Sequence, residues 1–227
     1  ECKVMKKIIK YFILIIVILI MIILAYFGYK FYIIHNIEKN LEELSLQTNY
    51  SYVVEYGETT VNGNTFTKYS SLNNMKVIED STGIIEAQFG ENEVYVLDNS
   101  TKQYLENADK NSLNEKFNDN VFQNFKYIFN SEGEDEKSFG FQLKLALKMK
   151  IKVENYNNIE CYALSYKTED NYVVTTYIDK EKLLRIAQTT TDNNEYNDII
   201  NYKWEFNTQV EDNYNKEIIL SGYTKII

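Results

Sequence analysis

The longest apolar stretch of the chain runs from Tyr11 to Tyr29 and contains no charged residue and no Pro. As a helix it extends roughly 28 Å, close to the ~30 Å hydrocarbon core of a bilayer. Lys10 and Lys30 flank it, and aromatic residues, which favour the headgroup region, occupy both borders. It has neither the polar stripe of a core helix nor the A-x-A site of a cleaved signal peptide. The pattern predicts a single transmembrane helix at residues 11–34.

Positive residues beside a span stay in the cytoplasm. Four lysines precede this span: Lys3, Lys6, Lys7 and Lys10. We therefore expect residues 1–10 to be a cytoplasmic tail and residues 35–227 to be an extracytoplasmic domain at the cell membrane. Met5, directly before two lysines, is interpreted as the natural first residue.

Beyond the span, apolar residues recur at spacings of three, four and three, at Ile34, Ile37, Leu41 and Leu44. This spacing places them on one face of an amphipathic helix. We expect this helix to continue the transmembrane helix outward and to end before Asn49.

From Asn49 the pattern changes to short runs rich in β-branched and aromatic residues, separated by turn sequences such as Asn62-Gly63. Short turns between such runs favour antiparallel hairpins. The expected strands are residues 49–57, 65–72, 75–80, 84–90, 93–98, 102–106, 159–167, 172–179, 183–191 and 196–207, with a final edge strand at 217–220.

A helix is expected between Ser112 and Asn130, because Ser112 and Glu115 form a capping box. Its apolar residues repeat every four positions, at Leu113, Phe117, Val121 and Phe125. A face this aromatic covers a large apolar surface. It either fills the core of the sheet or forms a lid over a cavity.

The stretch from Phe139 to Val153 alternates without a break, with an apolar residue at every odd position. A period of two over this length predicts a long, half-buried strand. Its even positions include Lys144, Lys148, Lys150 and Lys152. Such a row is interpreted as a solvated face, or as a contact with anionic lipid or wall polymer.

The chain has 24 Lys and Arg against 33 Asp and Glu, a net charge of −9, and five of its lysines lie in the first 30 residues. The part beyond the span is therefore more acidic still, which argues against binding to nucleic acid. The absence of Pro and the heavy use of Asn, Ile, Lys and Tyr fit AT-rich codons and indicate a bacterial protein.

Candidate chemistry is sparse. His35 is the only histidine and lies beside the membrane, so neither a His/Cys zinc site nor a Ser-His-Asp triad is expected. Cys161 is read as a small buried hydrophobe and Trp204 as a structural residue or a ligand platform. The carboxylates of Asp179 and Glu181 fall in a surface turn, so we expect no enzyme, no metal and no cofactor.

Three segments in the second half resemble the LolA-like superfamily, which includes LppX-type lipoproteins and RseB-type sensors. They are Asn158–Leu164 (NIECYAL), Tyr177–Arg185 (YIDKEKLLR) and Asn201–Phe206 (NYKWEF). The resemblance covers about residues 37–227. It implies a mainly β (α+β) fold, in which a curved antiparallel half-barrel carries one or two helices over an apolar concave face that binds acyl chains or lipidated partners.

These observations favour a membrane-anchored extracytoplasmic module of the bacterial cell envelope that binds a lipid or the acyl chains of a lipoprotein. An envelope sensor or scaffold that engages a protein partner and has no small ligand is the alternative. The candidate lining residues are Phe117, Phe125, Phe139, Phe141, Leu143, Leu145, Leu147 and Trp204.

Overall fold

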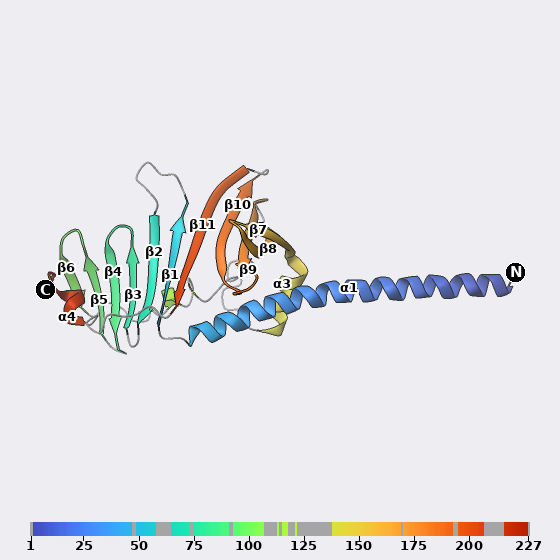
Figure 1. Ribbon diagram of the computed structural model, residues 1–227, viewed down its shortest axis with the longest axis horizontal. Helices are drawn as coiled ribbons and strands as arrows, with labels where there is room; N and C mark the ends of the chain where they lie inside the picture. Colours follow the sequence, from blue (N-terminus) through green and yellow to red (C-terminus); the bar gives the residue numbers. More distant parts are fainter. Residues whose placement is uncertain are drawn as a thin grey trace.

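The computed structural model describes residues 2–46, 49–57, 65–72, 75–90, 93–106, 113, 115–117, 121, 138–168, 170–192, 195–206 and 216–226. Helix α1 (Cys2–Ser45) is a single helix of 44 residues, which extends about 66 Å. Its first half projects from the rest of the protein and its second half lies along the sheet (Figure 1). Ile34, Ile37 and Leu41 are buried, so the predicted amphipathic continuation is confirmed.

Within the described residues, twelve strands form one sheet. Their bounds are β1 Asn49–Tyr56, β2 Thr65–Leu72, β3 Met75–Asp80, β4 Ile84–Phe89, β5 Glu93–Asp98, β6 Gln103–Glu106, β7 Lys150–Tyr156, β8 Ile159–Lys167, β9 Val173–Asp179, β10 Arg185–Asp192, β11 Glu195–Phe206 and β12 Thr224–Lys225. Their order across the sheet is β12-β6-β5-β4-β3-β2-β1-β11-β10-β9-β8-β7.

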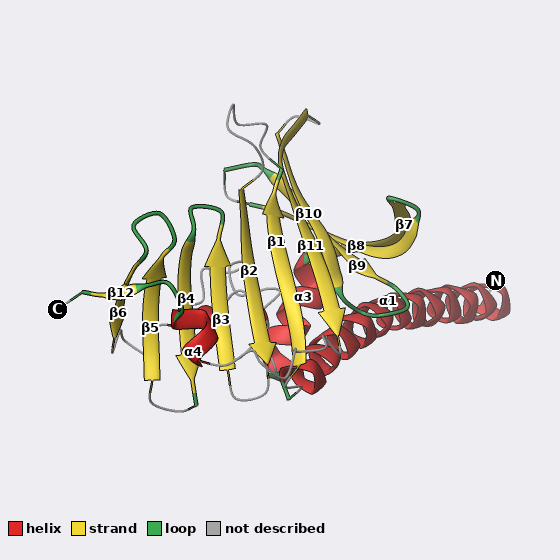
Figure 2. Cartoon of the chain, turned by 60° about the vertical axis from the view of Figure 1, so that its left-hand side comes forward, coloured by secondary structure: helices red, strands yellow, loops and turns green. Residues whose placement is uncertain are grey.

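The sheet consists of two antiparallel meanders, β1 to β6 and β7 to β11, which join where β1 pairs with β11. Only β12 runs parallel to its neighbour, β6. Figure 2 shows that the sheet curves and that its two edge strands, β7 and β12, do not meet. The prediction of a mainly β, open and curved antiparallel sheet is confirmed.

The predicted strand from Phe139 to Val153 is wrong in its first ten residues. Residues Phe139–Lys148 form helix α3, and strand β7 begins at Lys150. The Ser138 side chain accepts a hydrogen bond from the backbone N–H of Phe141 at 3.2 Å and so caps the helix. Leu, Lys, Ala and Gln are good helix formers, and helical neighbours four residues apart also satisfy a period of two.

This correction separates the four lysines that were expected on one strand face. Lys144 and Lys148 lie on α3, whereas Lys150 and Lys152 lie on β7.

The second correction concerns Glu217–Leu220, which was expected to be an edge strand. It belongs to helix α4 (Lys216–Leu220), and the edge strand is β12. The acidic Glu217 in the first turn suits the positive end of the helix dipole, and Gly222, with a φ of +85°, follows the last turn. Two residues near this end, Ile219 and Leu220, pack against the sheet.

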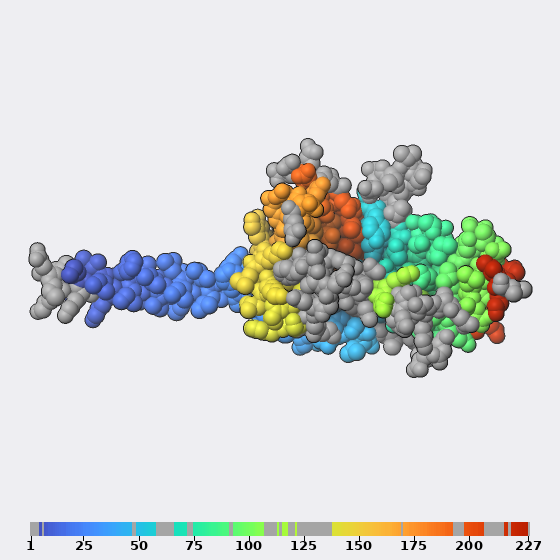
Figure 3. All heavy atoms as spheres, turned by 180° about the vertical axis from the view of Figure 1, so that it is seen from behind, coloured from blue at the N-terminus to red at the C-terminus, as the bar shows by residue number. Residues whose placement is uncertain are grey.

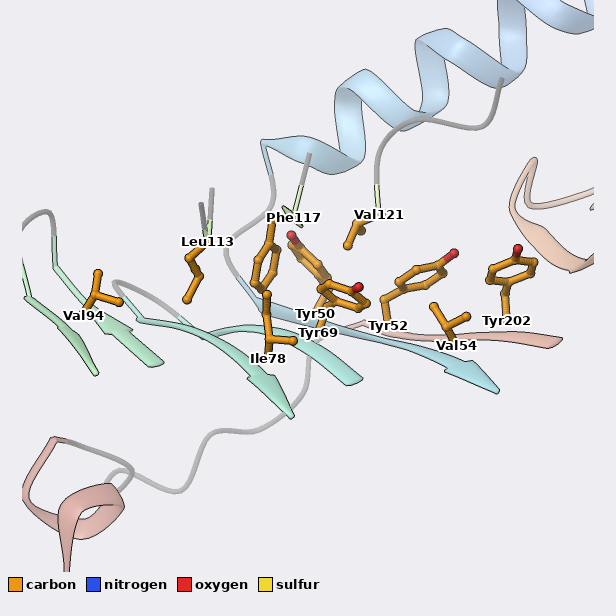
Figure 4. Close-up of a cluster of buried hydrophobic side chains, with 10 residues drawn as sticks. All are labelled: Tyr50, Tyr52, Val54, Tyr69, Ile78, Val94, Leu113, Phe117, Val121 and Tyr202. Carbon is orange, nitrogen blue, oxygen red and sulfur yellow. The ribbon is translucent and has the colours of Figure 1, made fainter. Parts of the chain in front are cut away.

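Adjacent residues of one strand point to opposite faces of the sheet. In β3, Ile78 joins a cluster with Phe117, whereas Val77 joins a cluster with Ile219 of α4. The face that contacts α1, α3 and Phe117 is termed the helix face, and the face that contacts α4 is termed the outer face. Figure 4 shows the side chains of the helix face between the strands and α1, with α4 beyond the other side of the sheet.

Candidate functional site

Four of the predicted lining residues are packed inside the domain. Phe117 is fully buried against the sheet, and the adjoining cluster includes half-buried Trp204. Phe141 and Leu145 of α3 are fully buried in a second cluster with Ile34 and Ile37 of α1. The structure therefore divides these four residues between two separate parts of the helix face.

The other four predicted residues do not share that environment. Phe139, Leu143 and Leu147 lie on the exposed side of α3, with 69%, 39% and 58% of their surface accessible. This set is termed the exposed row. Phe125 falls outside the described residues, whereas Leu113, residues 115–117 and Val121 of the predicted helix around it are helical.

The densest aromatic packing lies where β1 and β11 pair. In this register Tyr50 faces Phe206 and Tyr52 faces Trp204, so rings at alternate positions of both strands lie together on the helix face. The rings of Tyr52 and Trp204 have their centroids 4.4 Å apart. The ring of Tyr202 is stacked with that of Tyr52, with a centroid distance of 5.8 Å. The aromatic cluster comprises Tyr50, Tyr52, Tyr69, Phe117, Tyr202, Trp204 and Phe206 (Figure 4 shows all but the last two).

Within the described residues, two cations contact this cluster: the Nζ of Lys76 lies 5.5 Å from the ring centroid of Phe117, and Arg185 lies among the tyrosines. Arg185, at the start of β10, is only 7% exposed, and its Nη2 donates a hydrogen bond of 2.5 Å to the hydroxyl of Tyr52. Its Cζ lies 4.0 Å from the ring centroid of Tyr202, a close cation–π contact. The pairing of β10 with β9 shifts register between Arg185 and Ala187. Such a bulge changes the direction of the strand, and it lies next to the guanidinium.

The phenols around Arg185 remain neutral at physiological pH. Burial raises the pKa of Tyr52 well above its ordinary value, and this effect outweighs the lowering by the charge of Arg185. Burial raises the pKa of Tyr202 and Tyr50 in the same way. The guanidinium of Arg185 is therefore a positive charge among uncharged phenol rings, which suits an anionic or carbonyl oxygen carried by an apolar molecule.

Trp204 adds a second donor to the aromatic cluster. Its Nε1 is buried and has no hydrogen-bond partner within the described part of the chain. A buried donor that lacks a hydrogen bond is costly, so this N–H is available to an acceptor that reaches it.

Helix α1 covers one end of the cluster. Leu41 and Leu44 pack with Leu184, and Trp204 and Phe206 lie against this group. The side-chain amide of Asn40 donates to the carbonyl oxygens of residues 182 and 183, at 3.1 and 3.3 Å, and so fastens the β9–β10 turn to the helix.

Strand β11 carries the accessible part of this apolar surface. Ile200, Trp204 and Phe206 are half-buried, and Tyr202 between them is buried. From Ile200 to Phe206 the row extends about 20 Å, whereas one leaflet of a bilayer is about 15 Å thick. The row is therefore at least as long as one leaflet is thick.

A polar groove of about 510 Å³ lies at the turns between β7 and β8 and between β9 and β10. Asp179, one of its residues, accepts hydrogen bonds from the backbone N–H groups of Glu181 and Lys182 at 2.9 and 3.0 Å. Its carboxylate thus shapes the turn rather than facing a paired acid. No three His, Cys, Asp or Glu side chains in the described ranges are close enough together to hold a metal ion.

Sequence reasoning did not single out Arg185, Tyr52 or Tyr202. Two signals pointed to them: Arg185 is the only arginine in the chain, and both strands carry aromatic residues at alternate positions. The prediction for Cys161 is confirmed, since it is a free and fully buried residue of β8.

The open, curved sheet with α1 and α3 on its helix face agrees with the layout expected from the LolA-like resemblance, whereas the short helix α4 packs on the outer face. Among solved structures, an uncharacterized conserved protein from Thermus thermophilus is 12% identical, with a TM-score of 0.42 over 84% of this chain and 96% of that one. The MucA/MucB complex of Pseudomonas aeruginosa gives 9% identity and a TM-score of 0.36 over 79% of this chain and 59% of the other. A LolA superfamily protein from Nitrosomonas europaea is 8% identical, with a TM-score of 0.26 over 81% of this chain and 97% of that one. No protein-family model and no curated protein matches the chain.

Proposed function

We propose that the protein is a membrane-anchored extracytoplasmic binding module, and that its ligand is a lipid or the acyl chain of a lipoprotein. The acyl chain lies along Ile200, Tyr202, Trp204 and Phe206 of β11. An oxygen of its head accepts hydrogen bonds from Arg185 and from the Nε1 of Trp204.

The observation that carries this proposal is the pairing of buried donors with an apolar row. Ligand sites are mostly apolar, with a few polar groups that fix orientation. Arg185 and the Nε1 of Trp204 supply donors for an oxygen atom, and the flanking rings supply apolar surface. The neutral phenols and the absence of any histidine beyond His35 favour binding over catalysis.

The anchor in this proposal is the first part of α1. Within the described residues, Lys7–Ser45 is the one helix long and apolar enough to cross a membrane, and no residue of its most apolar window is buried inside the protein. Every large apolar side chain between Ile8 and Leu24 is exposed. The lysines before Tyr11 favour a cytoplasmic N-terminus, which leaves the sheet outside the cell membrane.

Quenching of Trp204 tests ligand binding, because it is the only tryptophan in the chain. The full chain is placed in nanodiscs and titrated with a brominated fatty acid, whose bromine atoms quench indole fluorescence on contact. We expect saturable quenching, which an excess of unlabelled fatty acid reverses.

A relocated tryptophan provides the matched control. The chain with Trp204→Phe and Leu105→Trp carries its indole on β6, near the other end of the sheet, where Leu105 is 49% exposed. Equal quenching of the two chains, or no quenching of Trp204 at any concentration, would contradict the proposal.

A further inference from the structure

Helix α3 has two apolar sides. One side, with Phe141, Leu145 and Ala146, is buried between α1 and the sheet. The exposed row of Phe139, Leu143 and Leu147 forms the other, one helical turn apart from residue to residue, and it extends about 12 Å. A helix that needed only to pack on the domain would carry polar residues there.

The exposed row begins beside the point on α1 where the free, apolar part of that helix ends and the part packed on the domain begins. The ring of Phe139 lies 5.2 Å from that of Phe31, which follows Lys30 near the C-terminal end of the predicted span at residues 11–34. One turn further along α3, the Oε1 of Gln142 lies 3.1 Å from the Nδ1 of His35. In Figure 3, α3 (yellow) crosses α1 at the end of the domain from which the free part of α1 (blue) projects.

Charge on the same helix complements an anionic surface. Lys144 and Lys148 follow Leu143 and Leu147 directly in sequence, both lysines are exposed, and α3 contains no acidic residue. The chain is acidic as a whole, whereas α3 itself carries two lysines and no acidic residue. Apolar residues beside lysines are the pattern of helices that lie in the headgroup region of a membrane.

We infer that α3 docks on the outer surface of the membrane that holds α1, and that its preferred partner there is anionic phospholipid. The exposed row inserts among the lipids next to the exit of α1, while Lys144 and Lys148 contact the phosphates. Two contacts, the span and α3, then fix the orientation of the sheet to the bilayer. This inference rests on the proposed membrane anchor.

Depth-dependent quenching tests the docking on the full chain. In a Cys2→Ser background, Leu147→Cys is labelled with an environment-sensitive fluorophore, and the chain is placed in vesicles of three parts phosphatidylcholine to one part phosphatidylglycerol. The buried Cys161 does not compete for the label. Leu19→Cys, within the span, and Leu105→Cys, on β6, are labelled as controls.

We expect doxyl-labelled lipid to quench positions 147 and 19 strongly and position 105 weakly, with position 147 shielded from aqueous iodide. Lys144→Glu with Lys148→Glu should release the label from lipid, because each lysine near an anionic surface favours the docked state by about fivefold. The same pair of changes should have little effect in pure phosphatidylcholine.

Each contrary result has its own meaning. Quenching of position 19 without quenching of 147 would overturn the docking of α3 and leave the anchor standing. A label at 147 that is shielded from iodide but not reached by lipid would assign the exposed row to a second copy of the chain, which also overturns the inference. No quenching at 19 would remove the anchor itself.

Discussion

Truncation of three leucines on α3, one at a time, should distinguish the observed helix from the strand that the sequence pattern predicted. Leu143, Leu145 and Leu147 alternate along the chain, so a half-buried strand would bury all three equally. In the structure only Leu145 is fully buried, whereas Leu143 and Leu147 are 39% and 58% exposed. Leu145→Ala leaves a cavity between α1 and the sheet and should reduce the free energy of unfolding by about 2–5 kcal/mol.

The two neighbours serve as matched controls, because Leu147→Ala removes no buried contact and should change stability by about 0.5 kcal/mol or less. In a domain of this size, a loss of about 3 kcal/mol lowers Tm by roughly 6–12 °C. Thermal unfolding of the full chain in neutral detergent, followed by near-ultraviolet circular dichroism, measures the difference. Similar losses of Tm for all three variants would refute the helical assignment of Phe139–Lys148.

Three further outcomes follow from single contacts. Ser138→Ala should destabilise the protein by about 1 kcal/mol in chemical unfolding, because it removes the cap of α3, and Ser138→Asp should restore most of the loss. The hydroxyl and backbone N–H of Ser100 lower the pKa of Asp98 to about 2, so its contribution to stability is complete above about pH 4 and is lost as pH falls toward 2. Asp98→Asn should therefore flatten the stability profile between pH 4 and 2, and an unchanged slope would contradict this role. Burial raises the pKa of the Cys161 thiol, so in a Cys2→Ser chain Ellman's reagent should react only after denaturant is added, and rapid reaction of the native protein would refute its burial.

Most of the sheet could be predicted from sequence, because its strands combine β-branched residues with short turns. The pairing of β1 with β11 could not, since the two strands lie about 150 residues apart and only their shared alternation of aromatic residues links them. That pairing creates the aromatic cluster. Arg185 was therefore visible as a lone arginine in the sequence but not as the cation of a buried site.

Two helices were mistaken for strands for different physical reasons. In α3 the apolar residues fit both the period of two of a strand and the spacing of a helix. The cap at Ser138 and the packing on α1 stabilise the helix. In α4 the segment is too short for any period to be informative. The same ambiguity hid the exposed row, since a strand would have placed Phe139 and Leu147 on the face of Leu145.

Mapping of acyl-chain contacts in cells would test the proposed function most directly. Cells that produce the full chain are supplied with a photoactivatable fatty acid, irradiated, and the crosslinked peptides are identified by mass spectrometry. Residues 11–32, together with the exposed row of α3, should crosslink to surrounding lipid and provide the internal positive control. The proposal predicts a second group of crosslinks in Tyr50–Val54 and Ile200–Phe206, which decreases when Arg185 is replaced by Met. Crosslinks confined to residues 11–32 and to α3 would contradict it.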